Sequence, residues 1–369
     1  MRRKFVLLFT FLLTFLFCSS AVSEEKVSVP DEIPEDAVSV CVTFLGDCTL
    51  GCEERERENP TSFDSYIHEH GYDYPFSGVI DILREDDLTV ANLESVFYNY
   101  EANKVPKTYN FRSSVDFVGI LPVSSVEAVS LSNNHTEDYD APGIRSTVAA
   151  LEGAGVEWFA TTEYANQGYI YEKDGIKIGF VSIYTSYWGY NIDGRYLHSE
   201  QLKRNIEALK EAGCSVLVGV MHGGVEYSAF HDEGQEKLAN FFIRNGISVV
   251  VGHHPHVIQG VSVRDNATVV YSLGNFVFGG NKNMRALYTM LAQVTFWFSP
   301  DGTYLGHRLN IIPAQYSGSP DYNDYRPIPV DGEAADKVIE MIQRDSNFRL
   351  SPYVSGVGAV QPFVPAANP

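Results

Sequence analysis

The sequence predicts a layered α/β fold, built on a mainly parallel sheet that is covered on both faces. Short runs of β-branched and apolar residues recur along the chain, as expected of strands that are buried on both sides. Between them lie segments with apolar residues at three- and four-residue spacing, as in amphipathic helices. These two patterns alternate from Val38 to Leu287, which is typical of repeated strand–helix units.

The predicted elements follow in chain order. Buried strands are expected at residues 40–45, 87–92, 128–133, 178–183, 215–221, 248–252 and 268–273. Helices are expected at residues 115–121, 143–154, 199–212 and 234–245. Ala212-Gly213 and Asn245-Gly246 are suitable helix ends, since glycine tolerates the left-handed conformation found there.

The pattern changes after Leu287 and becomes richer in strands. Residues 290–298 and 305–313 flank Ser299-Pro300-Asp301-Gly302, a strong turn signal, and predict an antiparallel hairpin that closes the sheet. Residues 333–344 predict a last amphipathic helix. Residues 349–369 are rich in Pro, Val and Ala, and we expect a loosely held tail there. The whole domain is therefore predicted to span residues 38–348.

The N-terminus has the pattern of a secretory signal. Basic residues at positions 2–4 precede an apolar run at 5–17, and small residues lead to Glu24. The run is shorter than the roughly 20 residues of a spanning helix, although an uncleaved anchor remains an alternative. Residues 1–23 are thus predicted to be a signal peptide or anchor and residues 24–37 a linker. This predicts export, to the outer face of the cytoplasmic membrane or into the medium.

Composition narrows the possible partners. With 44% hydrophobic residues among 369, the chain can build a packed core, and its formal net charge of −20 argues against nucleic acid as a partner. The same charge repels an acidic polymer, except where a basic patch or a bound cation reverses the local field. Cys48 and Cys52 flank a turn, and the sequence leaves open whether they form a disulfide or remain free thiols.

Polar side chains follow five of the predicted strands, where open α/β sheets bind ligands. These side chains are Asp47, Glu94, Asn134 with His135, His222 with Glu226, and His254 with His256. Carboxylates, imidazoles and an amide oxygen together suit Mn, Fe or Zn. The sequence therefore predicts a centre with one or two divalent metal ions.

The chain resembles the CapA family of poly-γ-glutamate capsule biosynthesis proteins over residues 38–290. The motifs that carry the resemblance are Gly46-Asp47, Asn92-Leu93-Glu94-Ser95, Tyr109-Asn110-Phe111-Arg112, Ser132-Asn133-Asn134-His135-Thr136, His222-Gly223-Gly224-Val225-Glu226, Gly252-His253-His254-Pro255-His256 and Tyr271-Ser272-Leu273-Gly274-Asn275. The resemblance implies the α/β/β/α sandwich of metallo-dependent phosphatases.

The resemblance also implies roles for single residues. Asp47 and His256 look like first-metal ligands, Glu94 like a bridging carboxylate, and Asn134, His222 and His254 like second-metal ligands. His135 looks like the histidine that protonates or orients the leaving oxygen. Arg112, Asn133 and Asn275 are candidate substrate-binding residues, and Arg285 is a further candidate for binding an anion. His253 is expected to be structural and to point away from the site.

Two departures from the wider superfamily pattern bear on activity. Asp47-Cys48-Thr49 stands where Asp-x-His is usual, and Glu94 stands where Asp is usual. Glu226 is a candidate ligand or base that compensates for the missing imidazole. The expected function is metal-dependent phosphoester hydrolysis, with a phosphoester or acidic polymer as substrate and membrane-bound capsule-synthesis proteins as partners. The alternative is a non-hydrolytic, metal-dependent component that handles or exports the polymer.

Overall fold

The computed structural model describes residues 33–184, 195–280 and 284–367. The predicted signal segment and the linker up to residue 32 lie outside these residues. The described residues belong to one compact unit, which begins at Ile33. Among their helices, none has both the length and the apolar character needed to cross a membrane.

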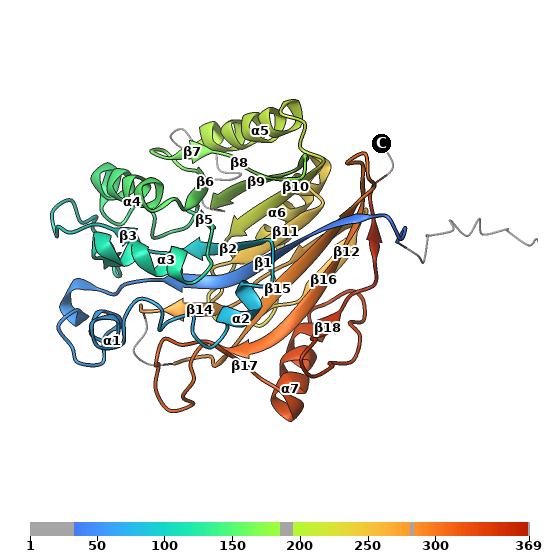
Figure 1. Ribbon diagram of the computed structural model, residues 1–369. Coiled ribbons are helices and arrows are strands. Elements are labelled where there is room, and N and C mark those ends of the chain that lie inside the picture. Colours follow the sequence, from blue (N-terminus) through green and yellow to red (C-terminus); the bar gives the residue numbers. More distant parts are fainter. Residues whose placement is uncertain (1–32, 185–194, 281–283, 368–369) are drawn as a thin grey trace, which may run out of the picture. The chain divides into compact units, whose positions relative to one another are not determined.

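Two sheets form the centre of this unit (Figure 1). The larger sheet has the order β17 (Ile328–Pro329), β16 (Tyr304–Gln315), β15 (Tyr288–Phe298), β1 (Val38–Thr49), β2 (Leu88–Leu93), β5 (Ala128–Ser130), β6 (Glu157–Thr161) and β7 (Asn166–Gln167). β14 (Asn275–Phe278) pairs with β1, and β18 (Ala359–Val360) and β19 (Val364–Pro365) pair with β16. The smaller sheet has the order β12 (Val261–Arg264), β13 (Ala267–Val270), β11 (Val249–His253), β10 (Val216–His222), β9 (Ile176–Tyr184) and β8 (Tyr169–Lys173).

The core shows that the two sheets face each other. Phe44 and Val90 of the larger sheet share one buried cluster with Phe180 and Val220 of the smaller sheet. A second cluster joins the other face of the larger sheet to α1 (Phe63–His70), α2 (Ile80–Leu83), α3 (Ile120–Val123) and α4 (Asp140–Ala154). A third joins the smaller sheet to α5 (Arg195–Glu211) and α6 (Glu233–Arg244). The layer order is therefore α/β/β/α, as the family resemblance implied.

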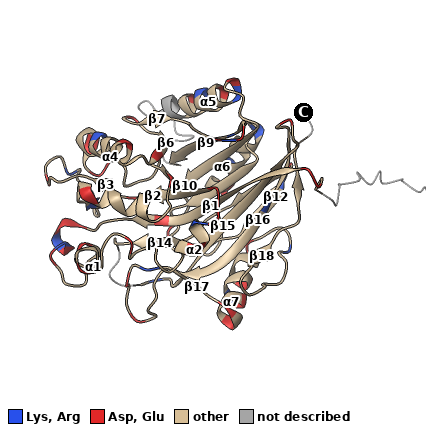
Figure 2. Ribbon diagram, in the orientation of Figure 1, with Lys and Arg blue, Asp and Glu red and all other residues tan. Residues whose placement is uncertain are grey.

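The strand pattern predicted a mainly parallel sheet covered on both faces, and the structure has two sheets that face each other. Strands that are apolar on both faces need cover on both sides, but the pattern does not tell whether a helix or a second sheet supplies it. Here each sheet has helices on one face and the other sheet on its second face. Charged residues accordingly lie mainly on the helices and loops, and the strands carry few of them (Figure 2).

The C-terminal hairpin and helix form as predicted, but the tail does not stay loose. β15 pairs antiparallel with β1 and with β16, and α7 (Gly332–Gln343) packs beside β16. Residues after 349 pair with β16 through β18 and β19, and Leu350, Ala359 and Val364 are buried. The apolar residues of this segment therefore complete the core, which composition alone did not indicate.

Close backbone packing lets the strand ends converge. β1, β2 and β5 are parallel, with Asp47 opposite Asn92, and β10 and β11 are parallel, with His222 opposite His253. A Cβ atom on Gly46 would lie 2.1 Å from the carbonyl oxygen of Gly274, so only glycine fits before Asp47. The amide of Asp47 donates to that same carbonyl (2.9 Å), which ties β1 to the start of β14.

Candidate metal centre

Glu94 is the central group of the site. It follows β2, is fully buried, and neither of its carboxylate oxygens has a hydrogen-bond partner. Its Oε1 lies 3.7 Å from His222 Nε2 and 3.9 Å from His135 Nε2. Burial, followed by the charge of Asp47, raises the pKa of Glu94 well above its usual value. A buried carboxylate without partners is costly, and a cation bound next to it would remove that cost.

Asp47 lies at the end of β1 and is also fully buried. Its Oδ1 accepts a hydrogen bond from Asn92 Nδ2 (2.9 Å), and its Oδ2 accepts one from the backbone amide of His254 (3.3 Å). Burial alone would raise the pKa of Asp47, but contacts with His253 and His256 lower it well below its usual value. Asp47 is therefore ionised in the folded protein.

Three predicted ligands converge on one point between the two sheets. His222 Nε2 lies 2.7 Å from Asn134 Oδ1 and 3.1 Å from His254 Nδ1. Burial lowers the pKa of His222 well below its usual value, and burial and the nearby His256 lower that of His254 to about 4. Both imidazoles are therefore neutral near pH 7, which is the form that ligates metals.

His256 completes the cluster from the loop after β11. Its Nδ1 lies 2.8 Å from Asn275 Oδ1 and 3.3 Å from Asp47 Oδ2. In the metal-free protein, burial lowers the pKa of His256, but the hydrogen bond with Asp47 and the charge of Glu94 outweigh burial and raise it to about 9, so a metal ion bound here would displace a proton from the ring. Both His254 (φ +98°) and His256 (φ +59°) have left-handed backbone conformations, a strain that concentrates at functional sites.

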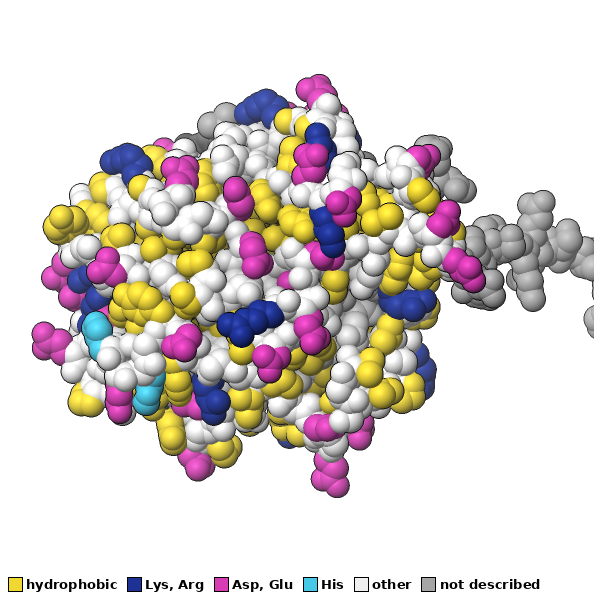
Figure 3. All heavy atoms as spheres, in the orientation of Figure 1, with side chains coloured by type: hydrophobic (Ala, Val, Ile, Leu, Met, Phe, Trp, Pro, Cys, Tyr) yellow, Lys and Arg dark blue, Asp and Glu magenta, His cyan; other side chains and the backbone are white. Residues whose placement is uncertain are grey.

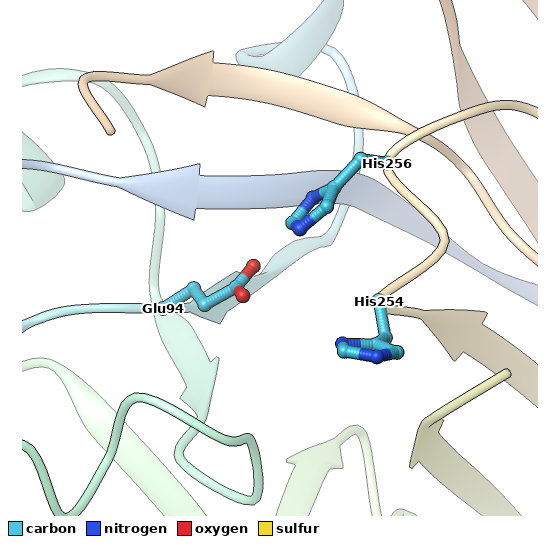
Figure 4. Close-up of side chains that lie close together, drawn as sticks. All are labelled: Glu94, His254 and His256. Carbon is cyan, nitrogen blue, oxygen red and sulfur yellow. The ribbon is translucent and has the colours of Figure 1, made fainter. Parts of the chain in front are cut away.

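The ligand atoms form two overlapping groups. One contains Asp47, Glu94 and His222, and the other contains Glu94, His254 and His256; within each group the atoms lie within 4.8 Å of one another. In Figure 4, the Glu94 carboxylate points toward the rings of His254 and His256, which come from a different part of the chain. Glu94 belongs to both groups, as a bridging carboxylate would. The side chains therefore fit one or two divalent cations.

His135 lies beside this cluster with its own support. Its Nδ1 is 2.8 Å from Asp138 Oδ2, and Asp138 also forms an ion pair with Lys107. The ring of Phe111 lies against that of His135, with 4.3 Å between centroids. Burial lowers the pKa of His135, partly opposed by Asp138. Nε2 is thus held on the side that faces Glu94.

The comparison with known families rests on the same segments. Residues 41–280, well over half of the chain, match the family model described as bacterial capsule synthesis protein PGA_cap. The chain belongs to this family.

Two curated relatives show how far the similarity to known capsule proteins extends. The chain is 26% identical over 258 residues to the capsule biosynthesis protein CapA of Bacillus anthracis, which covers 64% of this chain but only 59% of that protein. It is 24% identical over 360 residues to the PGA biosynthesis protein CapA of Bacillus subtilis, covering 93% of this chain and 86% of that one. The predicted CapA resemblance is therefore confirmed.

Solved structures give only distant matches. A phosphatase of Mycoplasma pneumoniae aligns with a TM-score of 0.44 and 13% identity over 78% of this chain and 96% of its own. The NAD nucleotidase of Haemophilus influenzae aligns with a TM-score of 0.41 and 12% identity, over 85% of this chain and 64% of its own. Likeness at this level carries no argument about function.

Two residues that were predicted to bind substrate near the candidate metal centre have structural roles instead. Arg112 forms an ion pair with Glu54 and donates to the carbonyl oxygen of Tyr98 (3.1 Å). Asn133 donates to the carbonyl oxygen of Leu93 (2.7 Å) and accepts from the amide of His135 (3.0 Å). Both side chains are buried and fasten loops, and among the described residues only Nε of Arg112 is left without a hydrogen-bond partner on these two side chains.

Other predicted residues need smaller corrections. Asn275 contacts His256 and orients it, as described above. Glu226 is exposed and lies outside both ligand groups, although its charge acts to raise the pKa of His254 and His256. His253 does not point away from the site, because its Nδ1 lies 3.2 Å from Asp47 Oδ1.

Cys48 and Thr49, which follow Asp47 where the wider superfamily has x-His, have structural roles. Thr49 Oγ1 donates to the backbone oxygen of Glu94 (3.2 Å), and Cys48 packs in the cluster on the helix side of the larger sheet. Burial raises the pKa of the Cys48 thiol to about 12, and Cys48 lies outside both groups of candidate ligands. Cys48 and Cys52 are both free thiols, which decides between the two alternatives left open by the sequence.

Two members of the site, Asn92 and Asp138, were not among the residues predicted from the sequence. Asn92 bonds Asp47 and lies 3.3 Å from His222 Nδ1, so it joins the two sheets. Asp138 holds His135. Both had a usable signal: Asn92 is a polar residue at the end of a buried strand, and Asp138 follows His135 by three positions, within reach of its ring.

Proposed function

We propose that this chain is an exported, metal-dependent phosphoester hydrolase that acts in capsule-polymer biosynthesis. The observation that carries the proposal is Glu94, a fully buried carboxylate with no hydrogen-bond partner and with imidazole nitrogens around it. Folding gains nothing from such a group, whereas a cation-binding site needs it. Membership of the PGA_cap family supports the link to the capsule, and the basic–apolar–small N-terminal pattern supports export.

Asp47, Glu94, His222, His254, His256 and Asn134 would hold one or two Mn, Fe or Zn ions. When bound, such an ion polarises a phosphoryl oxygen and lowers the pKa of a bound water. The chain's own contribution is to hold the ligands rigidly. Asn92 and His253 contact Asp47, and Asn275 contacts His256. These three residues therefore hold the carboxylate and imidazole ligands in place.

His135 is the proposed proton carrier. Asp138 accepts from Nδ1–H and stabilises the protonated ring, so that Nε2–H, which faces the cluster, can give its proton to a departing oxygen and leave the ring neutral. Phe111 and the burial of the ring exclude water from one side of this path. These contacts position His135 before a substrate arrives.

The test starts with the metal content of the purified full-length protein. Wild type should retain a stoichiometric divalent metal and should hydrolyse an aryl phosphate monoester or diester when Mn is added. His135→Ala should keep its metal but lose about 10²–10⁴-fold in kcat. His68→Ala, which alters an exposed histidine on α1, is the matched control and should behave as wild type.

Three results separate the hypotheses. Unchanged turnover in His135→Ala would show that this residue has no catalytic role. Bound metal without turnover on any phosphoester would favour the non-hydrolytic alternative, in which the cation holds carboxylates of the polymer. Absence of metal would remove both proposals.

A further inference from the structure

Lys107 lies on the surface loop of residues 98–111, beside the candidate metal centre. Its Nζ donates to the backbone oxygen of Asn134 (2.7 Å) and forms an ion pair with Asp138. The same Nζ lies 3.3 Å from Nδ1 of His135. One ammonium group therefore contacts a candidate metal ligand, the proposed proton carrier and the carboxylate that supports this carrier.

The carboxylate of this ion pair is buried, whereas the ammonium group reaches solvent. The side chain of Asp138 is 0% exposed and that of Lys107 is 30% exposed. Asp138 Oδ2 lies 2.8 Å from His135 Nδ1 and accepts from the amide of Phe111 (2.5 Å). Among the described residues, only Lys107 and His135 lie within ion-pair distance of Asp138. Without Lys107, a buried carboxylate would lose its counter-ion, and such a group rearranges or binds a proton.

The loop that carries Lys107 is fixed to Asp138 by separate bonds. The backbone oxygen of Asp138 accepts from the amide of Val105 (3.0 Å) and from Nδ2 of Asn110 (3.2 Å). Asn110 Nδ2 also donates to the backbone oxygen of Val105 (3.2 Å). None of these bonds uses the Lys107 side chain. Loss of the ammonium group should therefore remove its charge and its donors while the loop keeps its own anchors.

The bond from Lys107 to the backbone oxygen of Asn134 acts on the metal centre. Asn134 Oδ1 lies 2.7 Å from His222 Nε2, and His135 Nε2 lies 3.9 Å from Glu94 Oε1. The carbonyl that Lys107 holds belongs to the peptide that joins these two neighbouring residues. A change in the orientation of this peptide would move the candidate ligand and the proton carrier together, and a shift of about 1 Å is enough to impair a catalytic site.

We infer that Lys107 is a positioning residue, which holds His135 through Asp138 and holds Asn134 through its backbone carbonyl. In this role Lys107 acts through its partners. Its charge keeps Asp138 bonded to the His135 ring, and its second bond fixes the spacing between proton carrier and metal ligand. The inference rests on the proposed function, because it assigns a further residue to the same site.

Two measurements on the full chain test this role, and neither needs turnover. In NMR spectra of the metal-free protein with isotope-labelled histidine, the Nδ1–H signal of His135 is identified by its loss in His135→Ala. This signal should shift or broaden in Lys107→Met, which removes the charge and the donors. The affinity for Mn, measured by calorimetry, should fall about tenfold in the same variant, as for the loss of an outer-shell partner. Lys107→Arg keeps a charged donor and should restore part of both.

Lys104→Met is the matched control, because Lys104 is an exposed lysine of the same loop for which the described part of the chain shows no ion pair. It should match wild type in both measurements. Lys107→Gln, which also removes the charge, replaces Lys107→Met if the latter does not fold.

A lysine that only fastens the loop would affect the melting temperature alone. Either an unchanged His135 signal or an unchanged affinity for Mn in Lys107→Met would therefore overturn the inference. If the protein hydrolyses a phosphoester, the same variant should lower kcat about ten- to hundredfold with little change in KM. If the protein hydrolyses nothing but Lys107→Met changes both the ring signal and the Mn affinity, the hydrolase proposal fails and the positioning role stands.

Discussion

At the scale of single residues, the site is made of groups that do not help folding. Glu94 and His222 are fully buried ionisable groups, and His254 and His256 adopt left-handed backbone conformations. Each feature raises the free energy of the folded state. Together they are explained by a ligand that binds only the folded protein and stabilises it.

Glu94→Gln tests this account directly. The amide keeps the shape of the side chain but removes the charge that burial disfavours. We expect the affinity for divalent metal to fall by more than about 100-fold. We also expect the melting temperature of the metal-free protein to rise at pH 7.5, because the raised pKa of Glu94 destabilises the wild type above its unfolded-state pKa. A variant that keeps metal, or melts lower without it, contradicts the account.

His307 predicts a separate acid sensitivity. This residue of β16 is fully buried between Thr268 Oγ1 (2.7 Å) and the Tyr304 hydroxyl (2.6 Å), and burial lowers its pKa to about 3. The unfolded chain takes up a proton near pH 6.5 and the folded chain does not. Stability should therefore fall as pH drops from about 6.5 toward 3, by up to about 1.4 kcal/mol for each pH unit.

Denaturant melts at several pH values check this prediction. His307→Gln should be less stable than wild type at pH 8 but should show a flatter decline toward pH 4. His68→Gln, at an exposed position of α1, should decline like wild type. Parallel curves for wild type and His307→Gln would show that another group causes the acid sensitivity.

At the scale of elements, the ends of parallel strands in both sheets carry the centre. In the smaller sheet, His222 ends β10, and the loop after β11 carries His254 and His256. Asp345, just after α7, holds the loops that follow β10 and β11. It lies 2.8 Å from His231 Nδ1 and accepts from the amide of Gly260 (2.9 Å). A helix outside the family match at residues 41–280 therefore supports the site.

Asp345→Ala should loosen this support. Because both loops lose their common anchor, we expect about a tenfold loss of metal affinity, comparable to the loss of an outer-shell partner. Asp345→Asn, which keeps one acceptor, should lose less. Asp331→Ala, which removes the exposed N-cap of the same helix, is the control. A metal titration in which the alanine variants at 345 and 331 agree would show that Asp345 is only structural.

At the scale of the whole molecule, the C-terminal segment is part of the core. The larger sheet extends beyond the family match through β15, β16 and the segments that pair with β16. On the face in Figure 3, acidic and basic side chains are interspersed with apolar ones, so the net charge of −20 is not concentrated in one acidic patch there. The residues from Tyr288 onward thus contribute mainly through packing.

Removal of residues 350–369 should destabilise the protein strongly. Leu350 and Val364 are buried, and each such side chain contributes about 1.5–3 kcal/mol. The same deletion removes Gln361, whose Nε2 donates to Thr268 (2.9 Å) beside His307. We expect a fall of several kcal/mol in the free energy of unfolding. Val357→Ser, at a site 53% exposed, should change it little. A truncated chain as stable as wild type would mean that the tail does not pack.

The sequence by itself determined the α/β class, the positions of most buried strands, and the set of polar residues at their ends. It could do so because these features are visible in short stretches of sequence. Val40-Cys41-Val42-Thr43-Phe44-Leu45 is an apolar run that predicts a buried strand, and Gly46-Asp47 directly after it places a possible metal ligand at the strand end. Membership of the capsule family followed from the order of those motifs.

Only the tertiary structure decided which of those residues share a site. Arg112 and Asn133 have the same chemistry whether they bind a substrate or fasten a loop, and the difference lies in distant partners such as Glu54 and Leu93. The pairing of two sheets and the packed tail likewise depend on contacts between residues far apart in the chain. Such contacts leave no local pattern, because they are fixed by the shape of the assembled core rather than by neighbouring residues.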